Sequence, residues 1–177
     1  MTDEMAMMKC TKCGADLEES TCTTEAPYRY KASGLSNVFL VGVTLRTCPG
    51  GHGAVPVIPR MADLQSLLAH ILLEKPEGLV GEELRFLRKH VGLSGVEFAT
   101  RVQIDASTLS RIENDQQPMG KSTDMLARAV VAAAIEHERQ EELTKLLARG
   151  RYLEDARKRE MHLTCKQGKW REEKAAA

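Results

Sequence analysis

The chain has 177 residues, of which 42% are hydrophobic and 4% aromatic, so it can hold one ordinary domain or two small ones with a mainly aliphatic core. Its 25 basic and 25 acidic residues give a formal net charge of zero, which excludes a nucleic-acid-binding surface made by an excess of basic residues. The opening MTDEMAMMKC lacks the apolar segment of a signal peptide, and no apolar run is long enough to span a bilayer, so we expect a cytoplasmic protein with no membrane partner.

Cysteines give the first chemical signal in the chain. Cys10-Thr-Lys-Cys13-Gly14 has the two-residue spacing of a zinc knuckle, in which a tight turn directs both sulfur atoms at one point. Two thiolates leave a tetrahedral zinc ion incomplete, and Cys48-Pro-Gly-Gly-His52 offers two more ligands from a second tight loop. The predicted structural zinc site is therefore Cys10, Cys13, Cys48 and His52.

Three alternatives to this site stay open. Cys22 competes with His52 for the fourth position, although the threonines around it make no knuckle turn. The second alternative is that the cysteines are free cytosolic thiols. The third is that Cys10 and Cys13 form a redox-active pair. The redox reading is disfavoured because Cys10 and Cys13 do not lie between a strand and a helix of a βαβ unit.

Short β-like runs at 28–31, 37–40 and 43–47 lie between the two halves of the cysteine pattern. We expect a small antiparallel sheet with the zinc knuckles at its ends, because so few large apolar side chains need a metal to hold them together. Residues 54–60 are expected to be extended, since Pro56 and Pro59 favour that conformation.

A helix is predicted from Met61 to Glu74, with a continuous apolar stripe. We expect it to pack against the domain that follows, with a dimer contact as the alternative. Residues 75–78, Lys-Pro-Glu-Gly, are the expected hinge between the two halves of the chain.

Residues 80–119 have the pattern of two short helices joined by a tight turn. Phe98, Ala99 and Val102 lie on one face of the first helix, and Leu109 and Ile112 lie three apart on the second. Asp105 precedes the second helix and is its expected N-cap, accepting from the N–H of residue 107 or 108. With those apolar residues facing the core, the outward face of the second helix carries Ala106, Ser107, Ser110 and Arg111. A recognition helix presents such a face to the major groove, where Arg can bond to guanine O6 and N7.

This stretch resembles the helix-turn-helix of the phage-repressor-like XRE family. GEELRFLRKHVGLS matches the first helix of that family, Ala99 matches the small residue where two helices cross, and STLSRIEN matches the recognition helix with its terminal Asn114. Two positions depart from the family pattern. Gly95 stands where the family usually has Gln, and Gln103 stands where it usually has Gly. A left-handed backbone at Gln103 would cost roughly 1 kcal/mol or more.

A further helix is predicted over 121–138, closing the core of this domain. Lys121 and Ser122 lie at its N-terminus, where backbone N–H groups can hold a DNA phosphate. From residue 139 we expect a charged helical tail with a disordered end that contains Cys165 and Trp170. The basic residues of the tail are read as a solvated face, with phosphate contact as the alternative.

The combination of a two-knuckle zinc module with an XRE-like domain is similar to the MqsA family of antitoxins, over roughly residues 8–135. That resemblance implies a zinc module that binds an RNA-cleaving toxin and a C-terminal half that dimerises and represses its operon. Cys10, Cys13 and Cys48 match the metal positions, and His52 stands where the family has a cysteine. Ser107 and Arg111 match positions that contact bases in this group.

These patterns predict an α+β protein. A zinc-binding β module at 1–60 is followed by a helix and linker at 61–78, a helix-turn-helix domain at 79–138 and the tail at 139–177.

We expect a homodimeric repressor that binds a palindromic operator in double-stranded DNA. The alternatives are a solitary XRE-type regulator without a toxin and a protein whose main task is to neutralise one. An enzyme is disfavoured because the five histidines are scattered and no catalytic triad spacing appears. The candidate DNA-contacting residues are Ala106, Ser107, Thr108, Ser110, Arg111, Lys121 and Ser122.

Overall fold

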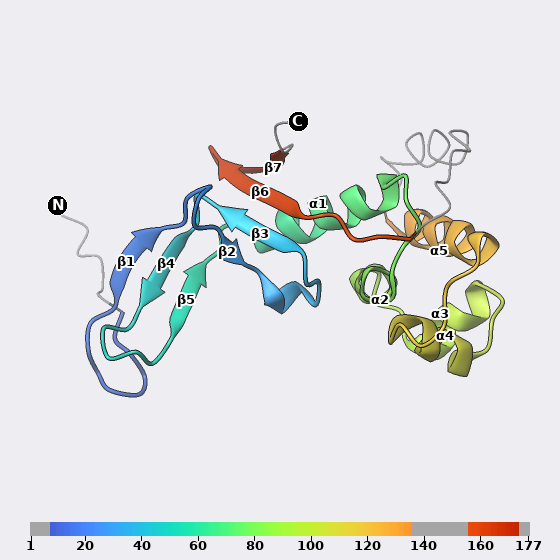
Figure 1. Ribbon diagram of the computed structural model, residues 1–177, viewed down its shortest axis with the longest axis horizontal. Coiled ribbons are helices and arrows are strands. Elements are labelled where there is room, and N and C mark those ends of the chain that lie inside the picture. The colour runs from blue at the N-terminus through green and yellow to red at the C-terminus, as the bar shows by residue number, and fades with distance from the viewer. Residues whose placement is uncertain (1–7, 136–155, 174–177) are drawn as a thin grey trace. The chain divides into compact units, whose positions relative to one another are not determined.

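A computed structural model describes residues 8–135 and 156–173. The chain divides into two compact units. The β unit contains the described residues of Met1–Tyr30, Val38–Met61 and Met161–Ala177, and the helical unit contains those of Lys31–Asn37 and Ala62–Glu160. The predicted α+β class is confirmed, with a β-rich N-terminal region followed by helices (Figure 1).

The β unit contains two sheets. The first is antiparallel, in the order β1 (Glu18–Thr21), β4 (Thr44–Thr47) and β5 (Ala54–Val57). The second has the order β2 (Tyr28–Arg29), β3 (Val38–Val41), β6 (Met161–Lys166) and β7 (Lys169–Glu173). A 3-10 turn, η1 (Lys31–Ser33), follows β2. The extended run and three of the predicted strands are therefore present, but they belong to two sheets rather than one.

The β6–β7 hairpin corrects the expectation of a disordered C-terminal end. β6 pairs in parallel with β3, with Val38 opposite Met161, and in antiparallel with β7. Trp170 of β7 is buried and its indole N–H donates to the carbonyl of Pro59 at 2.9 Å. Cys165 lies on β6, opposite Trp170. The predicted helical tail, where it covers residues 139–155, lies outside the described residues.

Apolar burial in the β unit is concentrated on the second sheet. Its side chains form most of the core there, which consists of Tyr30, Val38, Leu40, Val41, Met161, Leu163 and Trp170 together with Cys22, Val43 and Cys48. No residue of β1, β4 or β5 is buried. Apolar burial therefore stabilises the second sheet, whereas the strands of the first sheet contribute no buried residue.

The helical unit consists of α1 (Met61–Glu74, from Ala62 on), α2 (Gly81–His90), α3 (Gly95–Arg101), α4 (Ala106–Glu113) and α5 (Lys121–Ala134). α1 has the predicted bounds, and from Ala62 on it lies in the same compact unit as the helix-turn-helix. Its apolar stripe and the inner faces of the other helices form the core, whose fully buried members include Leu64, Leu68, Leu72, Leu79, Leu84, Leu87, Phe98 and Val131. No helix among the described residues is long and apolar enough to cross a membrane.

Arg128 holds the end of α1 and the segment after it. This side chain is 1% exposed and its guanidinium donates to Asp124 at 2.9 Å. It also donates to four backbone carbonyl oxygens at 2.7–3.0 Å, those of Leu72, Leu73, Lys75 and Glu77. The last carbonyls of a helix have no partner within the helix, so Arg128 supplies the donors that α1 lacks.

Residues 75–78, the expected hinge, lie within the helical unit and make buried polar contacts there. Lys75 is 3% exposed, and its ammonium donates to Glu83 at 2.7 Å and to the carbonyl of Gly78 at 3.0 Å. Burial raises the pKa of Glu83, against the opposing effect of Lys75. These bonds, with those of Arg128, satisfy polar groups that would otherwise make a buried connection unfavourable.

Candidate metal centre and DNA-binding surface

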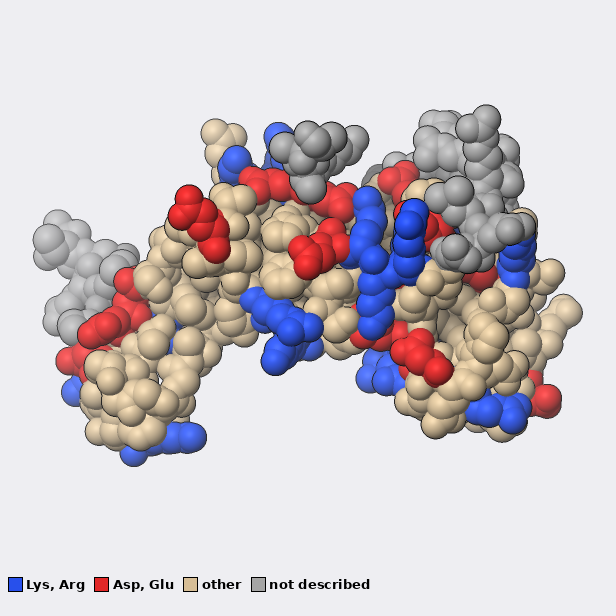
Figure 2. Space-filling view, viewed as in Figure 1, with Lys and Arg blue, Asp and Glu red and all other residues tan. Residues whose placement is uncertain are grey.

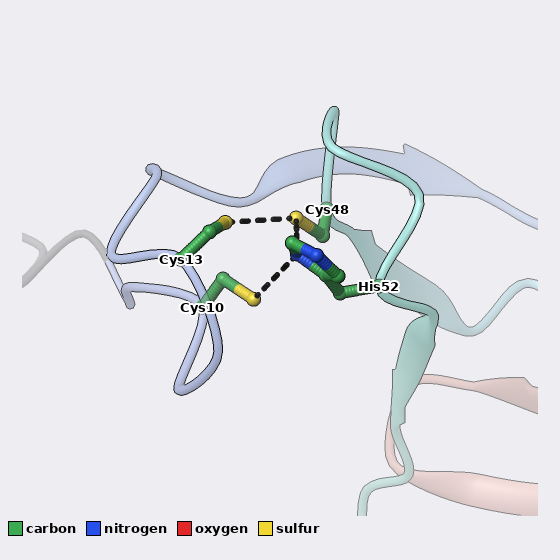
Figure 3. A group of neighbouring side chains, drawn as sticks. All are labelled: Cys10, Cys13, Cys48 and His52. Carbon is green, nitrogen blue, oxygen red and sulfur yellow. Dashed lines mark hydrogen bonds between the residues drawn. The ribbon is translucent and has the colours of Figure 1, made fainter.

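The four predicted metal ligands come together in the β unit. Cys10 and Cys13 lie in the turn before β1, and Cys48 and His52 lie in the loop between β4 and β5 (Figure 3). Their sulfur and Nδ1 or Nε2 atoms lie within 4.8 Å of one another. The Cys13 and Cys48 sulfur atoms are 3.5 Å apart, and His52 Nδ1 is 3.5 Å from the Cys48 sulfur and 3.7 Å from that of Cys10. The group can therefore hold a metal ion.

These separations fit one small tetrahedral ion. Zinc bonds of about 2.3 Å to sulfur and about 2.0–2.1 Å to nitrogen give ligand–ligand edges of roughly 3.5–3.8 Å in a tetrahedron. Three of the separations among the four side chains, those of 3.5–3.7 Å given above, fall in that range. Cys22 is 7% exposed and is not a member of the cluster, so His52 is the fourth member, as predicted.

Glycines make the tight loops that aim the ligands. Gly14 follows Cys13 with φ +73° and its N–H donates to the carbonyl of Cys10 at 2.8 Å. Gly51 has φ +74° and its N–H donates to the carbonyl of Cys48 at 3.0 Å. Only glycine adopts such angles at no steric cost, so these two positions allow each pair of ligands to face the same point.

Backbone N–H groups in the loops favour the thiolate form of two of the cysteines. The N–H groups of Lys12 and Cys13 lower the pKa of Cys10 from its ordinary 9.0 to about 6. The His52 N–H lowers the pKa of Cys48. The thiols of Cys48 and Cys10 in turn raise the pKa of His52. Thiolate is the form that binds metals, so the loops prepare the site for a cation.

The Cys13 thiol behaves differently. The N–H of Ala15 favours its thiolate, but the neighbouring thiols of Cys48 and Cys10 disfavour a further negative charge, and the net effect raises the pKa of Cys13. A like charge this close disfavours ionisation of a further thiol, and a bound cation would offset that effect.

The helix-turn-helix consists of α3, a tight turn and α4. Ser94 and Glu97 form a capping box at the start of α3, with the Glu97 N–H donating to Ser94 Oγ at 3.3 Å and the Ser94 N–H to the Glu97 carboxylate at 2.9 Å. Phe98, Ala99 and Val102 are buried, as predicted.

Gln103 ends α3 in a left-handed conformation with φ +57°. The N–H of Gln103 donates to the carbonyl of Thr100 at 3.3 Å, and that of Ile104 donates to the carbonyl of Ala99 at 3.0 Å. This pair of bonds is a Schellman motif. Gln103 therefore adopts the left-handed conformation at the position where the resembled family usually has glycine. The turn forms in spite of the cost of a side chain at this angle.

The N-terminus of α4 differs from the prediction in one detail. Asp105 is the N-cap residue, but its carboxylate makes no capping hydrogen bond. Asp105 is exposed, so water can satisfy the first N–H groups of the helix in place of the carboxylate.

α4 presents the predicted residues to solvent. Leu109 and Ile112 are 2% and 4% exposed, whereas the opposite face is exposed at Ala106, Ser107, Ser110 and Arg111. Thr108 is half-buried and its hydroxyl accepts from Arg111 at 3.1 Å. Lys121 and Ser122 are the first two residues of α5 and are exposed.

Two arginines of α2, missed from the sequence, hold the end of α4. Arg88 donates to both carboxylate oxygens of Glu113, at 2.6 and 3.0 Å, and Glu113 is 8% exposed. Arg85 donates at 2.6 Å to the Glu113 carbonyl and to Asn114 Oδ1. A paired Arg fork fixes both distance and angle, so these contacts set the orientation of α4 on α2. The only sequence signal was a pair of basic residues three apart on α2.

The charge of this domain gives little non-specific attraction for DNA. Residues 81–135 contain seven Lys or Arg and seven Asp or Glu. Basic and acidic side chains are interspersed on the face of the described residues that Figure 2 shows. Binding to DNA must therefore depend on the placement of a few side chains.

Comparison with known families agrees with this reading. A family model described as a helix-turn-helix domain matches residues 79–143. No curated protein and no solved structure matches the chain. Residues 79–143 are thus similar to a helix-turn-helix domain, which suggests a DNA-binding regulator, and the β unit contains a Cys3His cluster that could hold a metal ion.

Proposed function

We propose that the protein is a sequence-specific transcriptional repressor that reads its operator with α4. The single observation that carries the proposal is the division of α4 into a buried face, Leu109 and Ile112, and an exposed face that bears Arg111. Arg111 would read guanine in the major groove, and Ser107 and Ser110 would refine the choice of base. Ala106 is small enough to allow close approach, and Thr108 orients the guanidinium of Arg111.

Lys121 and Ser122 would contact a phosphate and fix the register on the duplex. One helix-turn-helix reads few bases, so two copies related by a two-fold axis are expected to bind a palindrome with half-sites about one helical turn apart. Selection of binding sequences from a random DNA pool by the full chain tests this. A palindrome with that spacing is the expected product, and recovery of unrelated sequences would reject sequence-specific binding.

We further propose that Cys10, Cys13, Cys48 and His52 hold zinc in a structural role. Four protein ligands leave no open position for a substrate, and three sulfurs with one nitrogen suit zinc. Metal analysis of the purified chain should find one zinc ion per protein. Cys13→Ser should lose that ion, whereas Cys22→Ser, a change outside the cluster, should keep it.

An antitoxin-like role is the second candidate function. It is favoured by a hollow of about 580 Å³ beside the metal cluster, with apolar walls that include Met8, Leu17, Val55 and Val57. Met8 and Val55 are each 60% exposed, and exposed apolar patches often bind other proteins. Co-expression of the chain with the product of the adjacent gene tests this role. Co-purification of the two proteins supports an antitoxin, and its failure leaves a solitary regulator.

A further inference from the structure

The two sheets of the β unit differ in what holds them together. All four residues of β1 are exposed, all four of β4 are half-buried, and β5 is exposed apart from Pro56. In the other sheet, β3 has three buried residues of four, and β6 also has three. A sheet without a buried apolar face gains little free energy to oppose the loss of chain entropy. The three-stranded sheet therefore needs another source of order.

The metal cluster joins parts of that sheet that are otherwise linked by strand pairing and by exposed side-chain contacts, chiefly the ion pair of Arg46 on β4 with Glu19 on β1 at 2.7 Å. Cys10 and Cys13 precede β1, and the ligands Cys48 and His52 are contributed by the β4–β5 loop (Figure 3). A shared metal ion would therefore connect the β1 end of the sheet to the β4–β5 end. The free energy of binding a metal to such ligands becomes free energy of folding for the segments that carry them.

The boundary between the two sheets lies at Cys22 and Val43, which are 7% and 1% exposed. The Cys22 N–H donates to the Val43 carbonyl at 3.0 Å, and the Gly42 N–H donates to the Cys22 carbonyl at 2.8 Å. On the β3 side of this pair the chain enters the apolar core of the four-stranded sheet. Disorder that begins at the metal ligands would stop here, because beyond this point burial stabilises the fold.

We propose that the metal ion acts as a local switch, which orders the β1–β4–β5 sheet while the β2–β3–β6–β7 sheet and the helix-turn-helix keep their structure without it. This inference rests on the metal site of the proposed function. The hollow beside the cluster is lined by residues 8–12 and 53–57, so its walls belong to the part that the metal controls. A partner that uses the hollow would bind the metal-loaded form alone.

Hydrogen–deuterium exchange of the full chain, before and after a strong chelator, tests the inference. Peptides covering 8–21 and 44–57 should exchange at least about tenfold faster without metal, whereas those covering β3, β6 and α2–α4 should change less than twofold. Uniform loss of protection across both sheets and the helical unit would overturn the local switch.

Cysteine variants separate failure of the inference from failure of the metal site. Cys13→Ser should reproduce the exchange pattern of the chelated protein, and Cys165→Ser, a change on β6 outside the cluster, should not. If the wild-type chain binds no metal, the metal site itself is wrong. If metal is bound and its removal leaves the exchange of 8–21 and 44–57 unchanged, the site stands and the switch is wrong.

Discussion

Replacement of Arg128 by methionine removes a charge that is buried in the helical unit and keeps most of the side-chain volume. The Arg128 side chain is 1% exposed and its partner Asp124 is 4% exposed, so the variant leaves a carboxylate in the interior without its cation. Breaking a buried ion pair from one side costs about 3–5 kcal/mol. Four carbonyl oxygens also lose their donor, which places the expected loss at the upper end of that range.

Urea denaturation followed by circular dichroism at the helical band measures this loss. Arg111→Met is the matched control, since it makes the same chemical change on the exposed face of α4 and should alter the free energy of unfolding by less than about 0.5 kcal/mol. A loss below about 1 kcal/mol in Arg128→Met would refute the assignment of Arg128 as the cap of α1.

Other substitutions test separate parts of the structure. Gln103→Gly should stabilise the helical unit by about 1 kcal/mol, because glycine accepts the left-handed angle. Gln116→Gly, at an exposed residue whose backbone is not left-handed, should not stabilise it, and thermal denaturation compares the two. Burial raises the pKa of Glu82, but bonds from Ser36 and Lys158 outweigh it and lower that pKa below its ordinary 4.5. Stability from Glu82 is therefore present above pH 4.5 and lost as the pH falls through the folded pKa. The difference in unfolding free energy between wild type and Glu82→Gln should accordingly shrink in acid, and a constant difference from pH 7 to pH 3 would contradict it.

Local sequence patterns predicted the helix-turn-helix and the metal ligands because each depends on residues close together in the chain. The periodicity of Phe98, Val102 and Ile112 reports the buried face of two short helices directly. The spacing of Cys10 and Cys13, and the glycines between Cys48 and His52, report two tight loops. Spacing alone could not show that the two loops lie next to each other. In the structure the four ligand atoms lie within 4.8 Å of one another.

Long-range pairing accounts for the principal error. β6 is ordered by its parallel pairing with β3, a strand far away in the sequence, and no pattern within residues 161–173 identifies that partner. β1 was missed for another reason, since its residues EEST are all exposed and lack the alternation of a half-buried strand.

Buried charges were also beyond prediction. Lys75, Glu83 and Arg128 are nearly inaccessible, yet charged residues are normally read as surface. Their burial depends on partners that include the end of α1 and the 75–78 connection, and most of those partners become visible only in three dimensions. The same holds for Glu113, whose role in orienting α4 follows from its contacts with two arginines of α2.

The affinity of Arg111→Ala for the selected operator and for random DNA tests the central claim most directly. Fluorescence anisotropy should show a loss of about 5- to 150-fold on the operator, corresponding to about 1–3 kcal/mol, with little change on random DNA. Lys89→Ala, which removes an exposed charge from α2, should leave the ratio of the two affinities unchanged. Equal loss of both affinities in Arg111→Ala would contradict base reading by α4.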